Sequence, residues 1–478
     1  LYYIRRGSKD EKPQFQMYDL GELKETNLAE IGGFEVSADQ KKFLVGKDGG
    51  FYIIDVPKGK IDFKDKLDLS GMEVNLDRHQ EWAQMYNECW RQMRDFFYAP
   101  NMNGVDWVGI RKKYEPLVQY VNTRADLTYI LGEVIGELSS GHTYVGGGDL
   151  ATPKRIMTGL LGAQLERDKQ SKFYRIKKIL KGENWDKSTR SPLTEVGVNA
   201  KEGDYILAVN GKSTNTMTDI YESLVNTVDK QVTLTLNSSP ELQGSRDVVV
   251  IPIGNEGSLY YYNWVENNIA KVEKATDGKV GYIHVPDMGV DGLNEFVKHF
   301  YPQLRKKALI IDDRGNGGGN VSPMLIERLR REISMIEVAR NTAPSTNPNE
   351  LLWGPKVCLI DEFSASDGDL FPYRFKKAKI GPLIGKRTWG GVVGIRGSLP
   401  LLDGGFLMKP EFSPYDADGK GWIIEGHGVD PDIVVDNDPA KEFAGDDEQL
   451  NKAIEVIMDS LKTQEHDIPP VPDYPIKK

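Results

Sequence analysis

Hydrophobic residues recur at helical spacing between residues 75 and 138. After Asn75, a residue type that caps helices, apolar side chains follow one another three or four places apart, as in an amphipathic helix. They are Trp82, Met85, Tyr86, Cys89, Trp90, Met93, Phe96 and Phe97. Two further helical patterns lie at about 107–121 and 124–138. We therefore expect a helical domain over residues 66–148, with the aromatic stripe in its core rather than around a cofactor.

The first 65 residues show short strand-like runs separated by Gly, Asp and Lys turns. Residues 34–56 contain three apolar segments around the turn sequences SADQKK and KDGG. This pattern is typical of a β-propeller blade, a repeat unit that cannot bury its face alone. One blade is too few to close a propeller. We expect residues 1–65 to be the end of a β-propeller and the chain to be the C-terminal part of a longer protein.

Residues 150–255 have the pattern of a small β-rich domain. The stretch KEGDYILAVNGKS (201–213) predicts a strand that ends in an Asn-Gly turn, and a helix is expected at 216–226. The stretch TGLLGAQL (158–165) resembles the loop and strand with which PDZ domains bind peptide ends by strand addition. Two interpretations stay open: a peptide-binding domain, or a rigid spacer whose groove is occupied.

From residue 257 to the end, strand and helix patterns alternate, which predicts an α/β domain. Buried strands are expected at 280–285, 308–313, 357–360 and 382–385, and helices at 290–305, 321–333, 367–378 and 446–461. The chain as a whole is therefore expected to be a multidomain α+β protein.

Composition and charge exclude several classes. Of the 478 residues, 39% are hydrophobic and 28% are charged, as in ordinary globular proteins. No run of about 18 apolar residues occurs, so no membrane span is predicted. The net charge of −10 argues against a nucleic-acid partner, because phosphate neutralisation needs clustered Lys and Arg. Cys89 and Cys358 lie in apolar helix-like and strand-like settings, so both are expected in the core.

Two serines lie in the stretch DEFSASDGDLF (361–371), where a predicted buried strand is followed by a predicted helix. Ser364 with Asp367, or Ser366 with Asp369, fits a helix capping box. A nucleophile at such a junction would gain an outward-pointing backbone N–H that stabilises an oxyanion. Spacing alone leaves the structural cap and the catalytic serine both open.

A catalytic serine needs a base, and two of the six histidines are candidates. His142 lies in GELSSGHTYVGGGD, where small residues surround one imidazole just after a helix. His427 lies in the Gly-bounded loop EGHGVDPD. His284 lies in the middle of a strand and is interpreted as a core residue. Spacing does not choose between His142 and His427.

A glycine-rich loop, DDRGNGGGNVS (312–322), lies between a predicted strand and a predicted helix. A phosphate site is one interpretation, but no Gly-Lys-Ser/Thr follows and the G-x-G-x-x-G spacing is incomplete. The alternative is a loop that presents a bare N–H to an acyl oxyanion, since glycine permits close approach.

The order of these motifs resembles that of the tricorn proteases, members of the S41 clan of serine peptidases. In chain order they are SSGHTY, the PDZ-like domain, DDRGNGGGNVS, FSASDGD, GKRTWGGVVGI and IEGHGVDPD. The resemblance covers about residues 76–478. With the propeller-like start, it implies four parts: the end of a β-propeller (1–65), a helical domain with the catalytic histidine (66–148), a PDZ-like domain (150–255), and an α/β catalytic domain of the ClpP/crotonase type (257–478).

The resemblance also implies roles for single residues. Ser366, the second serine of SASD, matches the nucleophile, and His142 matches the general base. The backbone N–H groups of Gly319 and Asp367 match the two oxyanion donors. Glu425 matches the acid that supports the base.

Two positions depart from the related patterns. Carboxy-terminal-processing proteases have a lysine base in a Phe-Gly-Lys-Gly segment, but here Gly391 stands in its place, so a histidine must take the proton. Tricorn proteases have a serine directly before the histidine, whereas this chain has Gly141 there and Ser140 one place earlier. Three relays stay open: Ser140 reaches in, a water bridges, or Glu425 contacts His142 directly.

The resemblance implies a serine endopeptidase that hydrolyses oligopeptides through an acyl-enzyme without a metal or cofactor. No His, Cys or Glu cluster has metal-ligand spacing either. Peptide or unfolded-protein substrates, a hexameric homo-oligomer and a cytoplasmic location are implied too, with the periplasm as the alternative location. Two competing functions remain: a catalytically weak peptide-binding scaffold, and a phosphate-binding enzyme that uses the glycine-rich loop.

Overall fold

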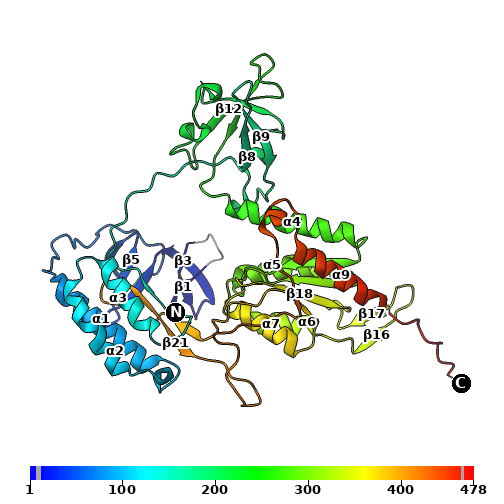
Figure 1. Cartoon of the computed structure of the whole chain (residues 1–478). Helices are drawn as coiled ribbons and strands as arrows, with labels where there is room; N and C mark the ends of the chain where they lie inside the picture. The colour runs from blue at the N-terminus through cyan, green and yellow to red at the C-terminus, as the bar shows by residue number, and fades with distance from the viewer. Residues whose placement is uncertain (7–11, 464–467, 478) are drawn as a thin grey trace. The chain divides into compact units, whose positions relative to one another are not determined.

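The computed structural model describes residues 1–6, 12–463 and 468–477, which divide into two compact units, residues 1–78 and 79–478. The first unit holds two three-stranded antiparallel sheets, ordered β1-β2-β3 and β4-β5-β6 (Figure 1). Its strands are β1 (Tyr2–Arg5), β2 (Gln14–Asp19), β3 (Lys24–Glu30), β4 (Gly33–Val36), β5 (Lys42–Lys47) and β6 (Gly50–Asp55). Its buried core consists of Phe15, Leu28, Ile31, Phe43 and Val45. Both sheets are open, so the propeller assignment stays a prediction.

The second unit begins with the expected helices, α1 (Arg78–Phe96), α2 (Trp107–Tyr114) and α3 (Arg124–Gly136). Helix α3 begins with a capping box in which Thr123 and Asp126 each accept from the other's backbone N–H. The aromatic stripe of α1 lies in the core as predicted, except that Phe96 is exposed. Phe96 is the last residue of α1, and the ammonium of Lys409 lies 5.8 Å from the centre of its ring.

A short sheet joins this helical layer to residues far along the chain. Strand β7 (Tyr144–Gly146) pairs with β21 (Phe406–Phe412), which pairs with β20 (Gly394–Arg396). Arg124 and Asp403 form an ion pair at 2.6 Å whose side chains are almost completely buried. Breaking such a pair from one side leaves an uncompensated buried charge. The segment that carries His142 is thereby fixed between the helices and the C-terminal part of the chain.

The next region is a β-domain with the strand order β13-β12-β10-β9-β8, and β11 pairs with β10. Its strands are β8 (Ala163–Arg167), β9 (Tyr174–Ile179), β10 (Tyr205–Val209), β11 (Lys212–Ser213), β12 (Val232–Asn237) and β13 (Arg246–Val250). The Asn210-Gly211 turn between β10 and β11 is confirmed.

The helix expected at 216–226 is wrong. In its place the chain forms the end of one 3-10 turn, Thr214–Thr216, and a second, Ile220–Ser223, which Asp219 caps by accepting from the N–H of Tyr221. Thr and Asn side chains before and after it favour non-helical backbone, because they compete for backbone hydrogen bonds. Asn226 then adopts a positive φ of 59°.

The last region is an α/β lobe around a parallel sheet of order β14-β15-β18-β19-β22. Its strands are β14 (Val280–His284), β15 (Ala308–Asp312), β16 (Met335–Glu337), β17 (Ser345–Asn347), β18 (Lys356–Ile360), β19 (Leu383–Gly385) and β22 (Ile433–Val434). Strands β16 and β17 form a separate hairpin. Its helices are α4 (Gly257–Ala275), α5 (Val290–Phe300), α6 (Ser322–Leu329), α7 (Asp367–Lys377), α8 (Pro439–Phe443) and α9 (Glu448–Thr463).

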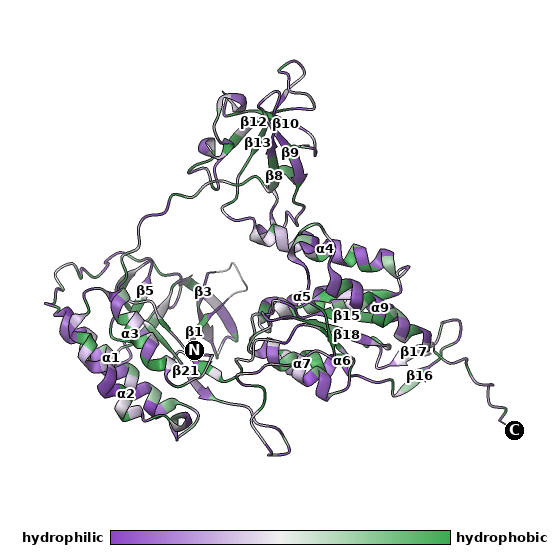
Figure 2. Cartoon of the chain, viewed as in Figure 1, coloured by the Kyte–Doolittle hydropathy of each residue, from purple (hydrophilic) through white to green (hydrophobic). Residues whose placement is uncertain are grey.

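Helices cover both faces of this sheet. Helices α4 and α9 pack on one face and α5, α6 and α7 on the other, so the lobe has three layers (Figure 1). Every residue of β14, β15 and β18 is buried, and hydrophobic residues run along β15 and β18 between the helices (Figure 2). Continuous apolar strands are the pattern of parallel sheets buried on both faces. Cys89 and Cys358 are buried and free, as expected.

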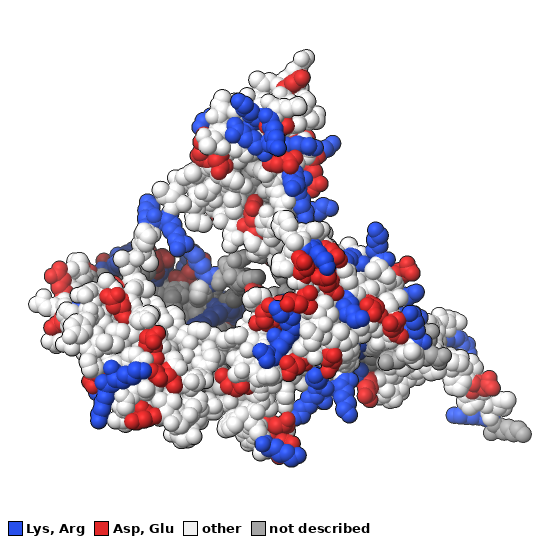
Figure 3. Space-filling model, in the orientation of Figure 1, with Lys and Arg blue, Asp and Glu red and all other residues white. Residues whose placement is uncertain are grey.

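Charged side chains of both signs are interspersed over the face of the molecule shown in Figure 3. Within the described ranges, the structure contains no helix with the length and apolar character that a bilayer crossing requires.

Candidate active site

Ser366 lies at the junction of β18 and α7 with its hydroxyl uncommitted. The residue is the N-cap of α7, but its backbone has φ 58° and ψ −117°, and its side chain makes no capping bond. Such a backbone is strained for a non-glycine residue and is typical of functional turns. Ser364, by contrast, is buried and donates its hydroxyl proton to the carbonyl of Asp313 at 2.8 Å. The two serines therefore differ: Ser364 holds the loop together, and Ser366 presents a free hydroxyl.

The glycine-rich loop packs directly against this serine turn. The N–H of Ala365 donates to the carbonyl of Asn316 at 2.9 Å. A side chain at Gly318 would come within 2.6 Å of Ser366 Cβ, and one at Gly368 within 2.7 Å of the Asn316 carbonyl. Only glycine fits at either position, because the backbones approach too closely for a Cβ. Contact with the serine turn thus explains the glycine at position 318 of this loop.

Two backbone N–H groups beside Ser366 are free to bind an anion. Within the described part of the chain, the N–H groups of Gly319 and Asp367 donate to no other atom. Gly319 has φ 149°, and a side chain there would overlap the Met288 carbonyl at 2.1 Å. The side-chain carboxylate of Asp367 accepts from the N–H of Ser322 at the start of α6. This carboxylate lies where a phosphate would bind, which argues against a phosphate site.

One short segment, Thr388–Val393, joins the serine turn to His142; we call it the connecting segment. The N–H of Trp389 donates to the Ser364 carbonyl at 3.0 Å. The Trp389 ring meets the His142 ring edge to face at 5.9 Å between centroids. Nδ1 of the buried His142 lies 2.7 Å from the carbonyl of Val393. The connecting segment thereby brings the predicted base and the predicted nucleophile loop onto one scaffold.

Glu425 binds the same segment rather than the imidazole. Its Oε2 accepts from the N–H of Val392 at 2.7 Å and of Val393 at 3.0 Å. The carbonyl of Val393 in turn faces His142 Nδ1, so the carboxylate and the ring both contact the backbone of Val393. Ser140 is buried, and its hydroxyl has no hydrogen-bond partner among the described residues.

Two other histidines, His427 and His284, contact partners outside the serine turn. His427 is exposed, and its Nε2 lies 2.8 Å from Asp430 Oδ2. His284 is a satisfied core histidine as predicted, with Tyr261 at 2.9 Å and the Arg314 carbonyl at 2.9 Å. Burial lowers the pKa of His284, which favours its neutral form.

At position 391, where the related proteases carry a lysine, a side chain would require the Trp389 ring to move. A Cβ there would lie 2.1 Å from the ring of Trp389. At Gly141 the nearest atom to an added Cβ is a Trp389 ring carbon at 3.8 Å, which is an ordinary contact. A serine therefore fits sterically before His142, although the chain has glycine.

Sequence reasoning missed the Val393 carbonyl and the Trp389 ring as partners of His142. Val393 is 251 residues from His142 in sequence, and a backbone carbonyl has no residue-type signal. The TWGG motif was the available pointer, since it marked the connecting segment without indicating what the segment touches.

Asp369 lies on the first turn of α7, fully buried behind the serine. Its Oδ1 accepts from the N–H of Gly390 at 2.7 Å. Burial raises its pKa to about 6 from the usual 3.8. Because the folded-state pKa is the higher one, protonation stabilises the fold. This stabilisation is complete below about pH 3.8 and is lost as the pH rises through about 6.

Asp369→Asn should therefore stabilise the protein at neutral and higher pH. The amide keeps an oxygen for Gly390 and removes the buried charge. We expect the free energy of unfolding to rise by about 1–3 kcal/mol at pH 8 and to change little at pH 4. Urea unfolding at both pH values measures this difference. Equal effects at the two pH values would contradict a raised pKa of Asp369.

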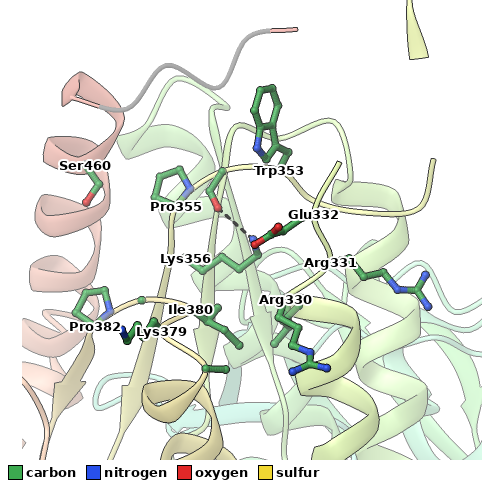
Figure 4. Close-up of a pocket in the computed structure, with 14 residues that line it drawn as sticks. Arg330, Arg331, Glu332, Trp353, Pro355, Lys356, Lys379, Ile380, Pro382 and Ser460 are labelled. Carbon is green, nitrogen blue, oxygen red and sulfur yellow. Dashed lines mark hydrogen bonds between the residues drawn. The ribbon is translucent and has the colours of Figure 1, made fainter. Parts of the chain in front are cut away.

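A hollow of about 680 Å³ lies at the end of the parallel sheet that is opposite to the serine turn (Figure 4). Lys356 lines it and donates to the carbonyls of Leu352 at 2.9 Å and Gly354 at 3.1 Å. Burial lowers the pKa of Lys356 to about 8. Strand β18 begins at Lys356 and ends before the serine turn, so this hollow is separate from the candidate active site.

Three family models match the chain. They are the Tricorn protease C1 domain over residues 78–136, the Tricorn protease PDZ domain over 159–255, and Peptidase family S41 over 279–435. Ser366 and Glu425 fall within the S41 match, and His142 lies between the other two. Fold and matches together define a PDZ domain joined to an α/β lobe of peptidase family S41.

Similarity to individual proteins extends over nearly the whole chain. Tricorn protease homolog 1 of Streptomyces coelicolor is 36% identical, over 96% of this chain and 43% of that protein. The tricorn protease of Thermoplasma acidophilum is 31% identical, over 97% and 43%. A crystal structure of the tricorn protease matches with a TM-score of 0.86 and 31% identity, over 95% of this chain and 44% of that one. The chain belongs to the tricorn protease family and spans less than half the length of these relatives.

Proposed function

We propose that this chain carries the catalytic centre of a serine endopeptidase that hydrolyses oligopeptides through an acyl-enzyme on Ser366. The observation that carries the proposal is the serine turn: an uncommitted hydroxyl at positive φ, beside the two free N–H groups of Gly319 and Asp367. A nucleophile next to preorganised donors is what acyl transfer needs, because charge develops on the carbonyl oxygen in the transition state. Membership of the tricorn protease family supports the same conclusion.

In this mechanism Ser366 Oγ attacks the peptide carbonyl carbon while His142 Nε2 takes the hydroxyl proton. The Val393 carbonyl can only accept, so in the neutral ring Nδ1 carries the proton and Nε2 keeps a lone pair. The N–H groups of Gly319 and Asp367 donate to the oxyanion of the tetrahedral intermediate. His142 then gives its proton to the leaving amine, and water hydrolyses the acyl-enzyme by the same steps.

Glu425 is proposed as a positioning residue. By accepting from two N–H groups of the connecting segment, it fixes the carbonyl that orients His142. Its negative charge also favours the imidazolium that forms during the reaction. Ser140 is proposed as a relay residue, supported by its buried hydroxyl, which has no hydrogen-bond partner among the described residues.

The substrates are proposed to be peptides and unfolded segments. A hexameric assembly, a preceding propeller and a cytoplasmic location rest on the family resemblance alone and are proposals as well. The alternative of a catalytically weak peptide-binding scaffold would require a peptide site that is open in the PDZ domain.

A fluorophosphonate probe tests the proposed function directly, because it reacts with activated serines. We expect the folded protein to be labelled on Ser366, as peptide mass spectrometry would show, and the heat-denatured protein to stay unlabelled. Labelling should be slowed by a competing peptide substrate. A protein that hydrolyses no fluorogenic peptide and takes up no probe would refute the peptidase assignment.

A further inference from the structure

The loop that opens the PDZ domain already holds a carboxylate from its own chain. Residues 159–162 lead into β8, which lies at the edge of the sheet. The N–H groups of Gly162 and Ala163 both donate to Oε1 of Glu256, at 2.7 Å and 3.3 Å. Peptide-binding PDZ domains bind an extended peptide along such an edge strand, and backbone N–H groups of this kind capture terminal carboxylates. Glu256 thus makes the contacts that a peptide terminus would make.

Backbone N–H groups are what hold this carboxylate. Within the described part of the chain, no Lys or Arg forms an ion pair with Glu256. Burial raises its pKa, and the hydrogen bonds from Gly162 and Ala163 oppose that rise. Tyr221, on the 3-10 turn of the domain, has its pKa raised by burial and then by the Glu256 charge. A carboxylate bound by amides without a cation is chemically equivalent to a bound peptide terminus.

The start of helix α4 makes further contacts with the PDZ domain, beside the contact of Glu256. Leu259 is fully buried, and an added Cβ at Gly162 would lie 3.3 Å from its side chain. Asn263 accepts from the N–H of Lys181 at 3.2 Å and donates to the Lys181 carbonyl at 2.7 Å. Residues 256, 259 and 263 follow helical spacing, so one face of the α4 start docks on the domain.

We propose that Glu256 closes the terminal-carboxylate site of the PDZ domain in cis, and that the site takes a peptide carboxylate only after Glu256 has left it. The ligand class is an extended peptide with a free C-terminal carboxylate, added along β8. The inference does not depend on the peptidase assignment, because it concerns binding at a different domain.

A tethered competitor explains why the site should be closed to ordinary peptides. Glu256 follows β13 by only a few residues, so its effective concentration at the loop is on the order of millimolar. A free peptide at micromolar concentration cannot displace it unless its own affinity is far higher. Removing the Glu256 carboxylate removes this competition without touching the loop.

The test compares Glu256→Ala with its parent, both carrying Ser366→Ala so that peptides stay intact. The probes are fluorescein-labelled hexapeptides ending in Leu, Val or Phe, each made as the free acid and as the C-terminal amide. Fluorescence anisotropy should show at least about tenfold tighter binding of at least one free acid to Glu256→Ala than to the parent. Its amide should bind weakly to both.

Glu266→Ala is the matched control, since Glu266 lies exposed on the same helix. It should bind as the parent does. The proposal is overturned if the parent binds the free acids as tightly as Glu256→Ala does. It is equally overturned if folded Glu256→Ala binds no free acid more tightly than its amide.

Amide hydrogen exchange tests the contact in case Glu256→Ala fails to fold. In the parent, the N–H groups of Gly162 and Ala163 should exchange slowly, because both are bonded to Glu256. Glu256→Gln keeps an acceptor oxygen but loses the charge, so the same two amides should exchange faster while the rest of β8 is unchanged. Unprotected amides at 162 and 163 in the parent would refute the cis contact.

Discussion

Ser366→Ala is expected to reduce kcat/KM for peptide hydrolysis by about 10³- to 10⁶-fold. The substitution removes the nucleophile but leaves the N–H groups of Gly319 and Asp367, so only their residual stabilisation of the oxyanion should remain. Binding of substrate should change little, because the Ser366 hydroxyl makes no capping bond to α7 and its loss therefore leaves the serine turn in place. Steady-state assays with fluorogenic peptides measure kcat and KM separately.

Ser364→Ala is the matched control, two residues away in the same loop. It removes the bond to the Asp313 carbonyl and should lower the free energy of unfolding by about 1–3 kcal/mol. Activity per folded molecule should fall far less than in Ser366→Ala. The assignment fails if Ser366→Ala keeps near-parental activity, or if Ser364→Ala is the inactive variant while still folded.

The choice between the two serines shows what sequence can and cannot supply. Both stand at capping-box spacing, so spacing left the structural cap and the catalytic serine both open, and only the family resemblance selected Ser366. The difference comes from tertiary contacts: Asp313 accepts the proton of Ser364, and the close approach of Gly318 accompanies the unusual backbone of Ser366. Neither partner is near the serines in sequence.

Helices and buried strands of the α/β lobe could be predicted because their periodicity is local. Strand β18 was expected at 357–360 and occupies Lys356–Ile360; helix α7 was expected at 367–378 and occupies Asp367–Lys377. The helix at 216–226 failed for a local reason as well, since its Thr and Asn content favours turns. Local sequence patterns were therefore sufficient to predict most helices and buried strands of this lobe.

Long-range connections could not be predicted in the same way. Strand β21 pairs with β7 across some 260 residues, and no periodic pattern specifies which distant strand a short strand joins. The same limit applies to Glu425 and His142, whose link runs through the backbone of Val393. The family resemblance indicated their roles, and the folded chain indicates how they are connected.

His142→Ala is expected to reduce kcat/KM to about the same residual level as Ser366→Ala. Without an imidazole nothing takes the proton of Ser366, and the hydroxyl is a weak nucleophile at neutral pH. Because base and nucleophile act as one unit, the double variant should be about as active as either single variant, rather than the product of two losses. Assays of the three variants under identical conditions measure this non-additivity.

His427→Ala is the control that separates the two candidate bases. His427 is exposed and pairs with Asp430, so its loss should leave kcat/KM within about twofold of the parent. Added imidazole should partly restore the activity of His142→Ala, because the space left between Trp389 and the Val393 carbonyl matches the lost ring. It should not restore the activity of Ser366→Ala. An inactive His427→Ala with an active His142→Ala would reverse the assignment. In that case His427 would be the base, and the contacts of the connecting segment with His142 would have only a structural role.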